Sequence, residues 1–339
     1  MKENRHITLG IETSCDETSI SLVADGRTVL SNIISSQIEI HKAYGGVVPE
    51  IASRHHLENI NVVLDEALEA AEIRLDEVDL IGVTKGPGLV GALLIGLATA
   101  KALSFSLGIP LIGVHHIKGH ICSNYLENKE LVPPFLACVV SGGHTNLVDV
   151  KDYNSYEVLG KTRDDAAGEA FDKVARVLNL GYPGGPLVDD LAKLGDSRAI
   201  DFKRVYLEKD SFDFSFSGIK TGVINYMHTK EQKREEINFA DVAASFQLAV
   251  VEVIVNKAIR AAKKMNRKTI VLAGGVAANS KLRSLMSIEC QKEGLSLNYP
   301  SNILCTDNGA MIACAAYYLF KAGELDDMSL DAYPNLKLE

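Results

Sequence analysis

The chain has 339 residues, of which 47% are hydrophobic and 23% are charged, and its formal net charge at pH 7 is −9. This length is sufficient for two domains, or for two lobes of one fold. The acidic balance argues against a free-standing nucleic-acid-binding protein, because non-specific contact with phosphates requires a basic surface. No apolar run reaches the ~20 residues that span a bilayer, and the N-terminus leads into a strand rather than a signal peptide. We therefore expect a cytoplasmic protein without membrane association.

The six cysteines are scattered along the chain and form no Cys-x-x-Cys pair. Such a distribution is typical of a reducing compartment, in which small buried thiols pack as apolar groups. It argues against a zinc site built from cysteines.

The first half of the sequence predicts strands joined by polar and glycine-rich turns. A turn of hydroxyl and carboxyl side chains, residues 13–18, separates the first two strands, and Asp25-Gly26 is a typical hairpin turn into the third. Residues 85–91 form a glycine-rich turn that opens a helix, where free backbone N–H groups could bind an anion or small residues could serve packing alone. The expected strands are 7–12, 19–24, 28–33, 78–84 and 109–114, and the expected helices are 48–71 and 92–107.

The second half repeats this plan after Pro133-Pro134. Two strands flank the polar turn Ser141-Gly142-Gly143-His144-Thr145, and a later strand runs through a glycine turn into a helix. The same order of elements in both halves predicts a duplicated α/β fold with a ligand cleft between the copies. We place the N-terminal lobe at residues 1–130 and the C-terminal lobe at 131–339. The repeated elements are strands 135–140, 146–150 and 269–273 and the helix 280–292.

The remaining segments of the second half are assigned one by one. A helix over 164–178 carries Asp165, Glu169 and Asp172, and the glycine–proline segment 181–186 reads as a rigid loop. Residues 212–218 alternate aromatic and polar side chains, as in a half-buried strand. Long helices are expected over 241–264 and from Asp307 to about 322, with Asp307 a potential N-cap.

A histidine pair stands out at residues 115–120, His-His-Ile-Lys-Gly-His. If residues 118–125 are helical, His116 and His120 lie on one face and can reach a single divalent metal ion. The pair is also compatible with two unrelated histidines at a strand–helix junction. A zinc peptidase of the His-Glu-x-x-His type is disfavoured, because Ile117 follows His116 where that motif has its glutamate.

Read together, these motifs resemble the TsaD family of tRNA threonylcarbamoyladenosine biosynthesis proteins, once labelled O-sialoglycoprotein endopeptidases. The resemblance runs from Ile7 to Gly323. It is carried, in order, by residues 10–18, 45–50, 87–89, 115–120, 141–145, 183–186 and 305–310. It implies a two-lobed actin-like (ASKHA) ATPase fold, whose last helix packs back toward the first lobe. It also implies transfer of a threonylcarbamoyl group from threonylcarbamoyl-AMP to N6 of the adenosine 3′ of the anticodon, in tRNAs that read codons beginning with A.

The resemblance also assigns residues. His116, His120 and Asp307 match the family's metal ligands, for which Fe²⁺ is expected first and Zn²⁺ or Mg²⁺ as alternatives. The positions that match its adenine-nucleotide site are Val139, Val140, Ser141, Gly142, Gly143, Asp172, Gly185, Asp189 and Asn279.

Two carboxylates of the first turn, Glu12 and Asp16, are our hypothesis for acid–base or positioning roles, although they could equally stabilise the turn. Two other functions remain open from the residues alone. A small-molecule kinase of the same fold would not need the histidine site, and a non-catalytic scaffold subunit would be expected to lack it. The resemblance implies tRNA as a partner, together with a TsaB-like paralogous subunit and a TsaE-like ATPase.

Overall fold

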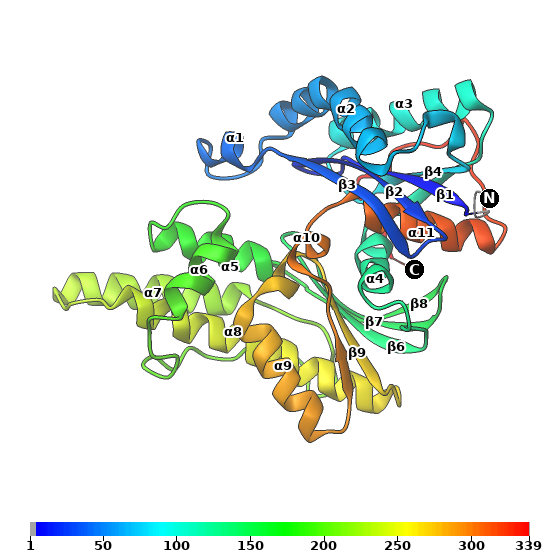
Figure 1. Ribbon diagram of the computed structural model, residues 1–339. Coiled ribbons are helices and arrows are strands. Elements are labelled where there is room, and N and C mark those ends of the chain that lie inside the picture. The colour runs from blue at the N-terminus through cyan, green and yellow to red at the C-terminus, as the bar shows by residue number, and fades with distance from the viewer. Residues whose placement is uncertain (1–4, 339) are drawn as a thin grey trace. The chain divides into compact units, whose positions relative to one another are not determined.

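The structure, a computed structural model, describes residues 5–338. The chain forms two compact units (Figure 1). Unit 1 comprises Met1–Pro133, Asp152–Ser155 and Pro300–Glu339, and unit 2 comprises Pro134–Lys151 and Tyr156–Tyr299. The predicted division after residue 130 lies close to the one at Pro133. Residues 300–339 are grouped with unit 1, because their helix packs on the first sheet, the side toward which the resemblance directs it.

Unit 1 is built on a five-stranded sheet with the order β3-β2-β1-β4-β5. β1 pairs antiparallel with β2 and β2 with β3, whereas β4 and β5 run parallel to β1. The carboxyl ends of the three parallel strands therefore meet at one edge, where ligands of open α/β sheets bind. The strands are β1 (Ile7–Glu12), β2 (Glu17–Ala24), β3 (Thr28–Ser36), β4 (Leu80–Gly86) and β5 (Leu111–His115).

Unit 2 repeats this sheet with the order β10-β9-β6-β7-β8. β6 pairs antiparallel with β7 and parallel with β9, and β9 pairs parallel with β10. Each strand thus holds the position of its counterpart in unit 1, and the predicted duplicated α/β fold is confirmed. The strands are β6 (Phe135–Val140), β7 (Thr145–Asp152), β8 (Ser155–Lys161), β9 (Thr269–Ala273) and β10 (Ser296–Asn298).

Helices cover both faces of the first sheet (Figure 1). α2 and α3 lie on one face, over an apolar cluster that includes Leu9, Ile11, Ile60 and Leu97. On the other face α11 packs against β1, β2, β4 and α4. The helices of unit 1 are α1 (Ile38–Lys42), α2 (Pro49–Ala71), α3 (Val90–Leu107), α4 (His116–Glu127), α10 (Asn302–Cys305) and α11 (Gly309–Lys321), with a 3₁₀ turn, η1 (Leu75–Glu77).

The second unit is organised around α8, which packs against β6, β9 and the helices α6, α7 and α9. Its apolar side chains are buried along almost the whole helix, so α8 forms the centre of this unit's core. The helices are α5 (Ala167–Val177), α6 (Gly184–Ala192), α7 (Ser217–Lys233), α8 (Phe239–Lys264) and α9 (Ser280–Lys292), with a 3₁₀ turn, η2 (Gly275–Ala278).

Three expectations for unit 2 are wrong. Residues 212–218 are not a strand: Phe214 makes one isolated bridge to Thr162, and α7 begins at Ser217. The segment 181–186 is not only a loop, because α6 begins at Gly184. Pro186 is accommodated in its first turn, where a helix has no use for the N–H that proline lacks. Asp165 precedes α5 rather than lying on it.

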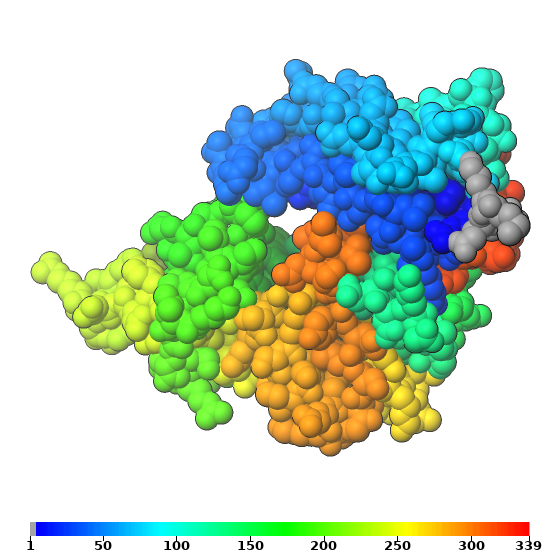
Figure 2. All heavy atoms as spheres, viewed as in Figure 1, coloured from blue at the N-terminus to red at the C-terminus, as the bar shows by residue number. Residues whose placement is uncertain are grey.

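Two helices are apolar and long enough to span a membrane by length and composition, α3 and α8. In α8, 89% of the apolar window is buried inside the protein, as in a core helix. α3 buries one face against the sheet, and only 33% of its window is covered. α2 and part of α3 form the top of the view in Figure 2. The exposed apolar side chains of these two helices are Leu57, Val62, Val90, Leu94 and Phe105.

Candidate functional site

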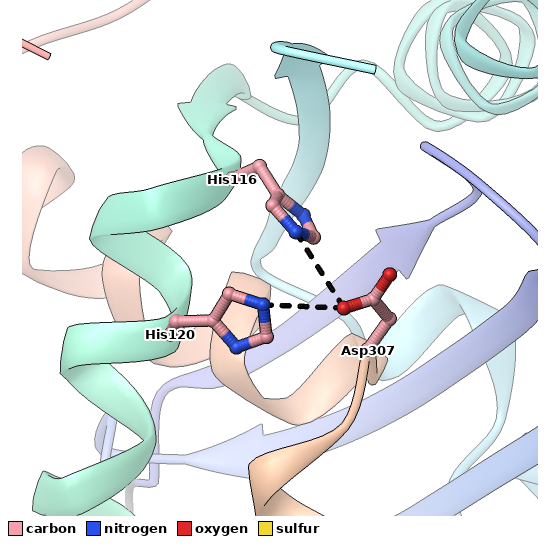
Figure 3. Close-up of side chains that lie close together, drawn as sticks. All are labelled: His116, His120 and Asp307. Atoms are coloured by element: carbon pink, nitrogen blue, oxygen red, sulfur yellow. Dashed lines mark ion pairs between the residues drawn. The ribbon is translucent and has the colours of Figure 1, made fainter. Parts of the chain in front are cut away.

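Two histidines of α4 and one aspartate from the C-terminal segment meet in unit 1 (Figure 3). His116 and His120 are four residues apart on one helix face, and their ring centroids lie 4.6 Å apart. Asp307 lies between α10 and α11 and directs Oδ1 toward both rings, 3.5 Å from His116 Nε2 and 3.2 Å from His120 Nε2. The three ligand atoms all lie within 4.8 Å of one another.

The local sequence explains how α4 presents these rings. β5 ends at His115, whose Nδ1 accepts a hydrogen bond from the Ile117 N–H and caps the helix. The helix therefore starts at His116, two residues before the predicted start, and both histidines point from its first two turns. Asn308, not Asp307, caps α11, because its Oδ1 accepts from the Met311 N–H. The carboxylate of Asp307 is thus not used as a helix cap.

This donor set fits a metal ion. His116 and His120 are buried, and within residues 5–338 neither ring nitrogen of His120 makes a hydrogen bond. Buried polar atoms without hydrogen bonds are costly unless something else binds them. Two imidazoles and one carboxylate are a ligand set of catalytic zinc and non-haem iron sites, in which further coordination positions stay open.

The buried carboxylate of Glu12 lies behind His116. Its Oε2 is 3.1 Å from His116 Nδ1 and accepts a 2.6 Å hydrogen bond from Thr84 Oγ1, while Oε1 accepts from the Ser14 N–H. Burial opposes ionisation of both partners, yet each stabilises the charged form of the other. The pKa of Glu12 is held below its ordinary value, and Asp307 and Glu12 together raise the pKa of His116 to about 9.

Asp16 belongs to the same turn and is more weakly connected. Burial raises its pKa, and the negative charge of Asp307 raises it further. Its carboxylate is hydrogen-bonded within its own turn, to Cys15 and to its own backbone. The acid–base role suggested for Asp16 remains a prediction.

Unit 2 gathers backbone groups and small residues at the corresponding edge of its sheet. β6 ends with Val139 and Val140, whose side chains are fully buried, so these two residues can offer only backbone groups. The turn that follows is held by the N-terminal part of α5, where the Gly168 N–H donates to Ser141 O and the Glu169 N–H to Gly142 O. A Cβ at Gly142 or Gly143 would meet nothing within 4 Å, so the turn borders open space.

Three of the other predicted nucleotide residues, Asp172, Asp189 and Asn279, have structural partners of their own. Asp172 Oδ1 accepts a 2.7 Å hydrogen bond from the Gly184 N–H, and the Cα of Gly185 faces open space. Asp189 accepts from Gln247 Nε2 and Ser280 Oγ, and Asn279 caps α9. Asp189 thus ties α6 to the start of α9.

Comparison with known proteins identifies the family. A family model for TsaD, tRNA N6-adenosine threonylcarbamoyltransferase, matches residues 28–314. The chain belongs to the TsaD family. The tRNA N6-adenosine threonylcarbamoyltransferase of Clostridioides difficile (strain 630) is 60% identical over 332 residues, which are 98% of each chain. That of Clostridium perfringens (strain SM101) is 58% identical over 335 residues, 99% of each chain.

Solved structures show the same fold at low sequence identity. Full-length HypF in its phosphate- and nucleotide-bound form superposes with a TM-score of 0.62 at 14% identity, covering 94% of this chain and 47% of HypF. Component A of the Acidaminococcus fermentans (R)-2-hydroxyglutaryl-CoA dehydratase superposes with a TM-score of 0.54 at 17% identity. The match covers 94% of this chain and 100% of component A. At such identities the likeness concerns the fold alone, and it confirms the expected actin-like ATPase fold for this TsaD-family chain.

Ser14 and Thr84 also lie at the candidate site, although the sequence did not predict them. The Ser14 hydroxyl lies 3.2 Å from His116 Nδ1, and Thr84 holds the carboxylate of Glu12. The strand pattern contained the necessary information. Glu12 and Thr84 are the last residues of two expected strands, and His116 follows the end of the expected strand 109–114. Side chains at the carboxyl ends of neighbouring parallel strands meet at one edge.

Glu17, at the start of β2, should make the free energy of unfolding depend on pH. Burial raises the pKa of its carboxyl to about 8, with Asp16 and Asp307 adding to the shift and the Ser36 hydrogen bond opposing it. An unfolded glutamate titrates near 4.5, so the folded state holds this proton more tightly. The resulting stabilisation is complete below about pH 4.5 and is lost as the pH rises through about 8.

We expect the free energy of unfolding to fall across this range more steeply than in Glu17→Gln, which keeps an acceptor for Ser36 and does not titrate. The slope of the difference between the two proteins should be at most about 1.4 kcal/mol per pH unit. Urea unfolding at pH 5, 6, 7 and 8 measures it. A constant difference between wild type and variant at all four pH values would show that Glu17 titrates normally.

Proposed function

We propose that the chain transfers the threonylcarbamoyl group of threonylcarbamoyl-AMP to N6 of the adenosine 3′ of the anticodon, in tRNAs that read codons beginning with A. Family membership supports this reaction. The observation on which its proposed location rests is the cluster of His116, His120 and Asp307. The new bond joins N6 to the carbamoyl carbon. The bond from that carbon to the phosphate oxygen breaks, AMP leaves with the electron pair, and N6 gives up a proton.

A divalent metal ion would be held by His116, His120 and Asp307. We propose Fe²⁺ first and Zn²⁺ next, because imidazole suits both ions, and we rank Mg²⁺ below them because it prefers oxygen ligands. When bound, such an ion supplies a Lewis acid that offsets the negative charge growing on the leaving phosphate.

Unit 2 is proposed to hold the adenine nucleotide. The backbone N–H groups of Gly142 and Gly143 can donate to phosphate oxygens, whereas that of Ser141 donates to His144 O within the turn. The two glycines also leave room for close approach. The carboxylate of Asp172, oriented by the Gly184 N–H, can accept from ribose hydroxyls, with Gly185 leaving space beside it. Asp189 supports this site by fixing the start of α9, and with it Asn279.

The acceptor amine is a weak nucleophile, so positioning of the two substrates should dominate the rate, with a proton taken late. Asp16 is our candidate for the group that receives this proton. Its pKa is raised by burial, which makes the carboxylate a stronger base than an exposed one.

The family acts on tRNA, and we infer that this chain binds tRNA mainly within an assembly. Its net charge of −9 is unfavourable for binding phosphates alone. A TsaB-like paralogous subunit and a TsaE-like ATPase are the proposed partners, and the cytoplasm is the proposed location.

A transfer assay tests this function and separates it from the alternatives. The chain, with its proposed partners, receives threonylcarbamoyl-AMP and unmodified tRNA, and both modified adenosine and AMP are measured. Equal amounts of the two products are expected, and a chelator should abolish both. ATP turnover driven by a sugar or carboxylate acceptor would instead identify a kinase. Full transfer by the partners without this chain would identify a scaffold.

A further inference from the structure

We infer that Glu12 is a positioning residue, which orients His116 toward the metal ion instead of exchanging protons with the substrate. This inference rests on the proposed metal site and specifies how the protein prepares it. Glu12 is fully buried, with its side chain enclosed between the ends of β1 and β4 and the start of α4.

The contacts of the carboxylate leave it little freedom. Oε1 accepts the Ser14 N–H at 2.5 Å, and Oε2 accepts the Thr84 hydroxyl at 2.6 Å. One contact comes from the backbone of the turn after β1 and the other from the neighbouring strand β4. Both oxygens are thereby fixed by groups that belong to the sheet and its turn.

The remaining contact of Oε2 is His116 Nδ1, at 3.1 Å. A carboxylate is only an acceptor, so it selects the imidazole form with its hydrogen on Nδ1. With Nδ1 keeping its hydrogen toward Glu12, the nitrogen left to bind a metal ion is Nε2, which faces Asp307 Oδ1. Carboxylate partners of this kind fix the orientation of a metal-binding histidine and make it a more basic ligand.

The two histidines differ in their hydrogen-bond partners. Within residues 5–338 neither ring nitrogen of His120 has a hydrogen-bond partner, whereas His116 has Glu12 and the Ser14 hydroxyl. His116 is therefore the ligand whose geometry is prepared before metal binding. The location of Glu12 also argues against direct proton transfer, because a fully buried carboxylate behind a ligand does not reach a substrate amine.

Metal affinity tests the inference independently of transfer activity. Purified wild-type chain, Glu12→Gln and Glu12→Ala are stripped of metal and titrated with Zn²⁺ or Co²⁺ against a competing chelator. Loss of such an outer partner commonly weakens metal binding by about 10–100-fold. We expect a loss of that size for Glu12→Ala and a smaller loss for Glu12→Gln, which keeps an acceptor for Nδ1–H. The visible absorption of bound Co²⁺ should shift in both variants.

Asp16→Asn is the matched control. It removes a carboxylate from the same turn, one that makes no hydrogen bond to either histidine in the described part of the chain. Its Zn²⁺ affinity should change by less than about threefold, because Asp16 acts on the ligands only through a partly screened charge. Glu12→Gln preserves side-chain volume, and its thermal unfolding shows whether the fold is kept.

Wild-type metal affinity in folded Glu12→Gln and Glu12→Ala would overturn the inference. If those variants also lost transfer, Glu12 would act in the chemistry itself. A wild-type chain that bound neither ion tightly would refute the metal site, and with it this role of Glu12. If the wild-type chain bound metal tightly but did not transfer the threonylcarbamoyl group, the proposed function would be refuted and the role of Glu12 at the metal site would stand.

Discussion

Replacing His116 with alanine is expected to remove the bound metal ion and to lower transfer to tRNA by more than about 100-fold. The magnitude follows because even an outer partner of a metal ligand is commonly worth about 10–100-fold, and His116 is one of three ligands. The change also leaves Glu12 buried without the imidazole beside it, which adds a stability cost. His120→Ala should have the same effect on metal content with less effect on stability, because the carboxylate beside it, that of Asp307, is only partly buried.

Metal content by elemental analysis and single-turnover transfer from supplied threonylcarbamoyl-AMP are the two measurements. His228→Ala is the control, because His228 is exposed on α7 and should not affect either quantity. Normal transfer by a His116→Ala protein free of metal would show that the cluster is structural and that the reaction proceeds without it.

The sequence predicted parts of this site for different reasons. The pair His116 and His120 is local, since a helical spacing of four brings both rings to one face. Asp307 became a ligand candidate only through the family resemblance. No spacing rule relates it to α4, because α11 reaches the first sheet through the tertiary packing of residues 300–339.

The sheets were predicted more reliably than the connections in unit 2. Buried strands such as β1 and β6 have apolar runs that few other elements share. In contrast, α7 was missed and a strand was expected just before it. Phe214 and Phe216 do alternate with polar residues, but Asp164 binds the backbone N–H groups of Phe216 and Ser217 and fixes the start of a helix there. That tertiary contact is not visible in a local pattern.

The packing of α11 on β1 should make Gly10→Ala one of the most destabilising single-methyl changes in unit 1. A Cβ at Gly10 would lie 2.5 Å from the Ala313 backbone nitrogen and closer still to the Gly309 carbonyl oxygen. Backbone atoms cannot move aside as a flexible side chain can, so the helix itself must shift. Overpacking costs about 1–3 kcal/mol and occasionally more, and we expect at least about 3 kcal/mol here.

Gly222→Ala is the matched control, with the same methyl group added inside α7. Its Cβ would meet Phe202 Cδ1 at 3.7 Å, an ordinary contact, so the better helix propensity of alanine should stabilise the protein by about 0.5–1 kcal/mol. Urea unfolding of the two variants should thus give opposite signs. If Gly10→Ala proved as stable as wild type, β1 and α11 would be less closely packed than the structure indicates.

The same variant links the fold to the metal site. Asp307 lies two residues before the first residue of α11, and the Gly309 N–H donates to Ser19 Oγ on β2. A helix displaced from β1 would therefore carry the carboxylate of Asp307 away from His116 and His120. Gly10→Ala protein that remains folded should bind Zn²⁺ more weakly than Gly222→Ala protein, although neither residue is a ligand. Equal Zn²⁺ affinities in the two folded variants would mean that the position of Asp307 does not depend on the contact between α11 and β1.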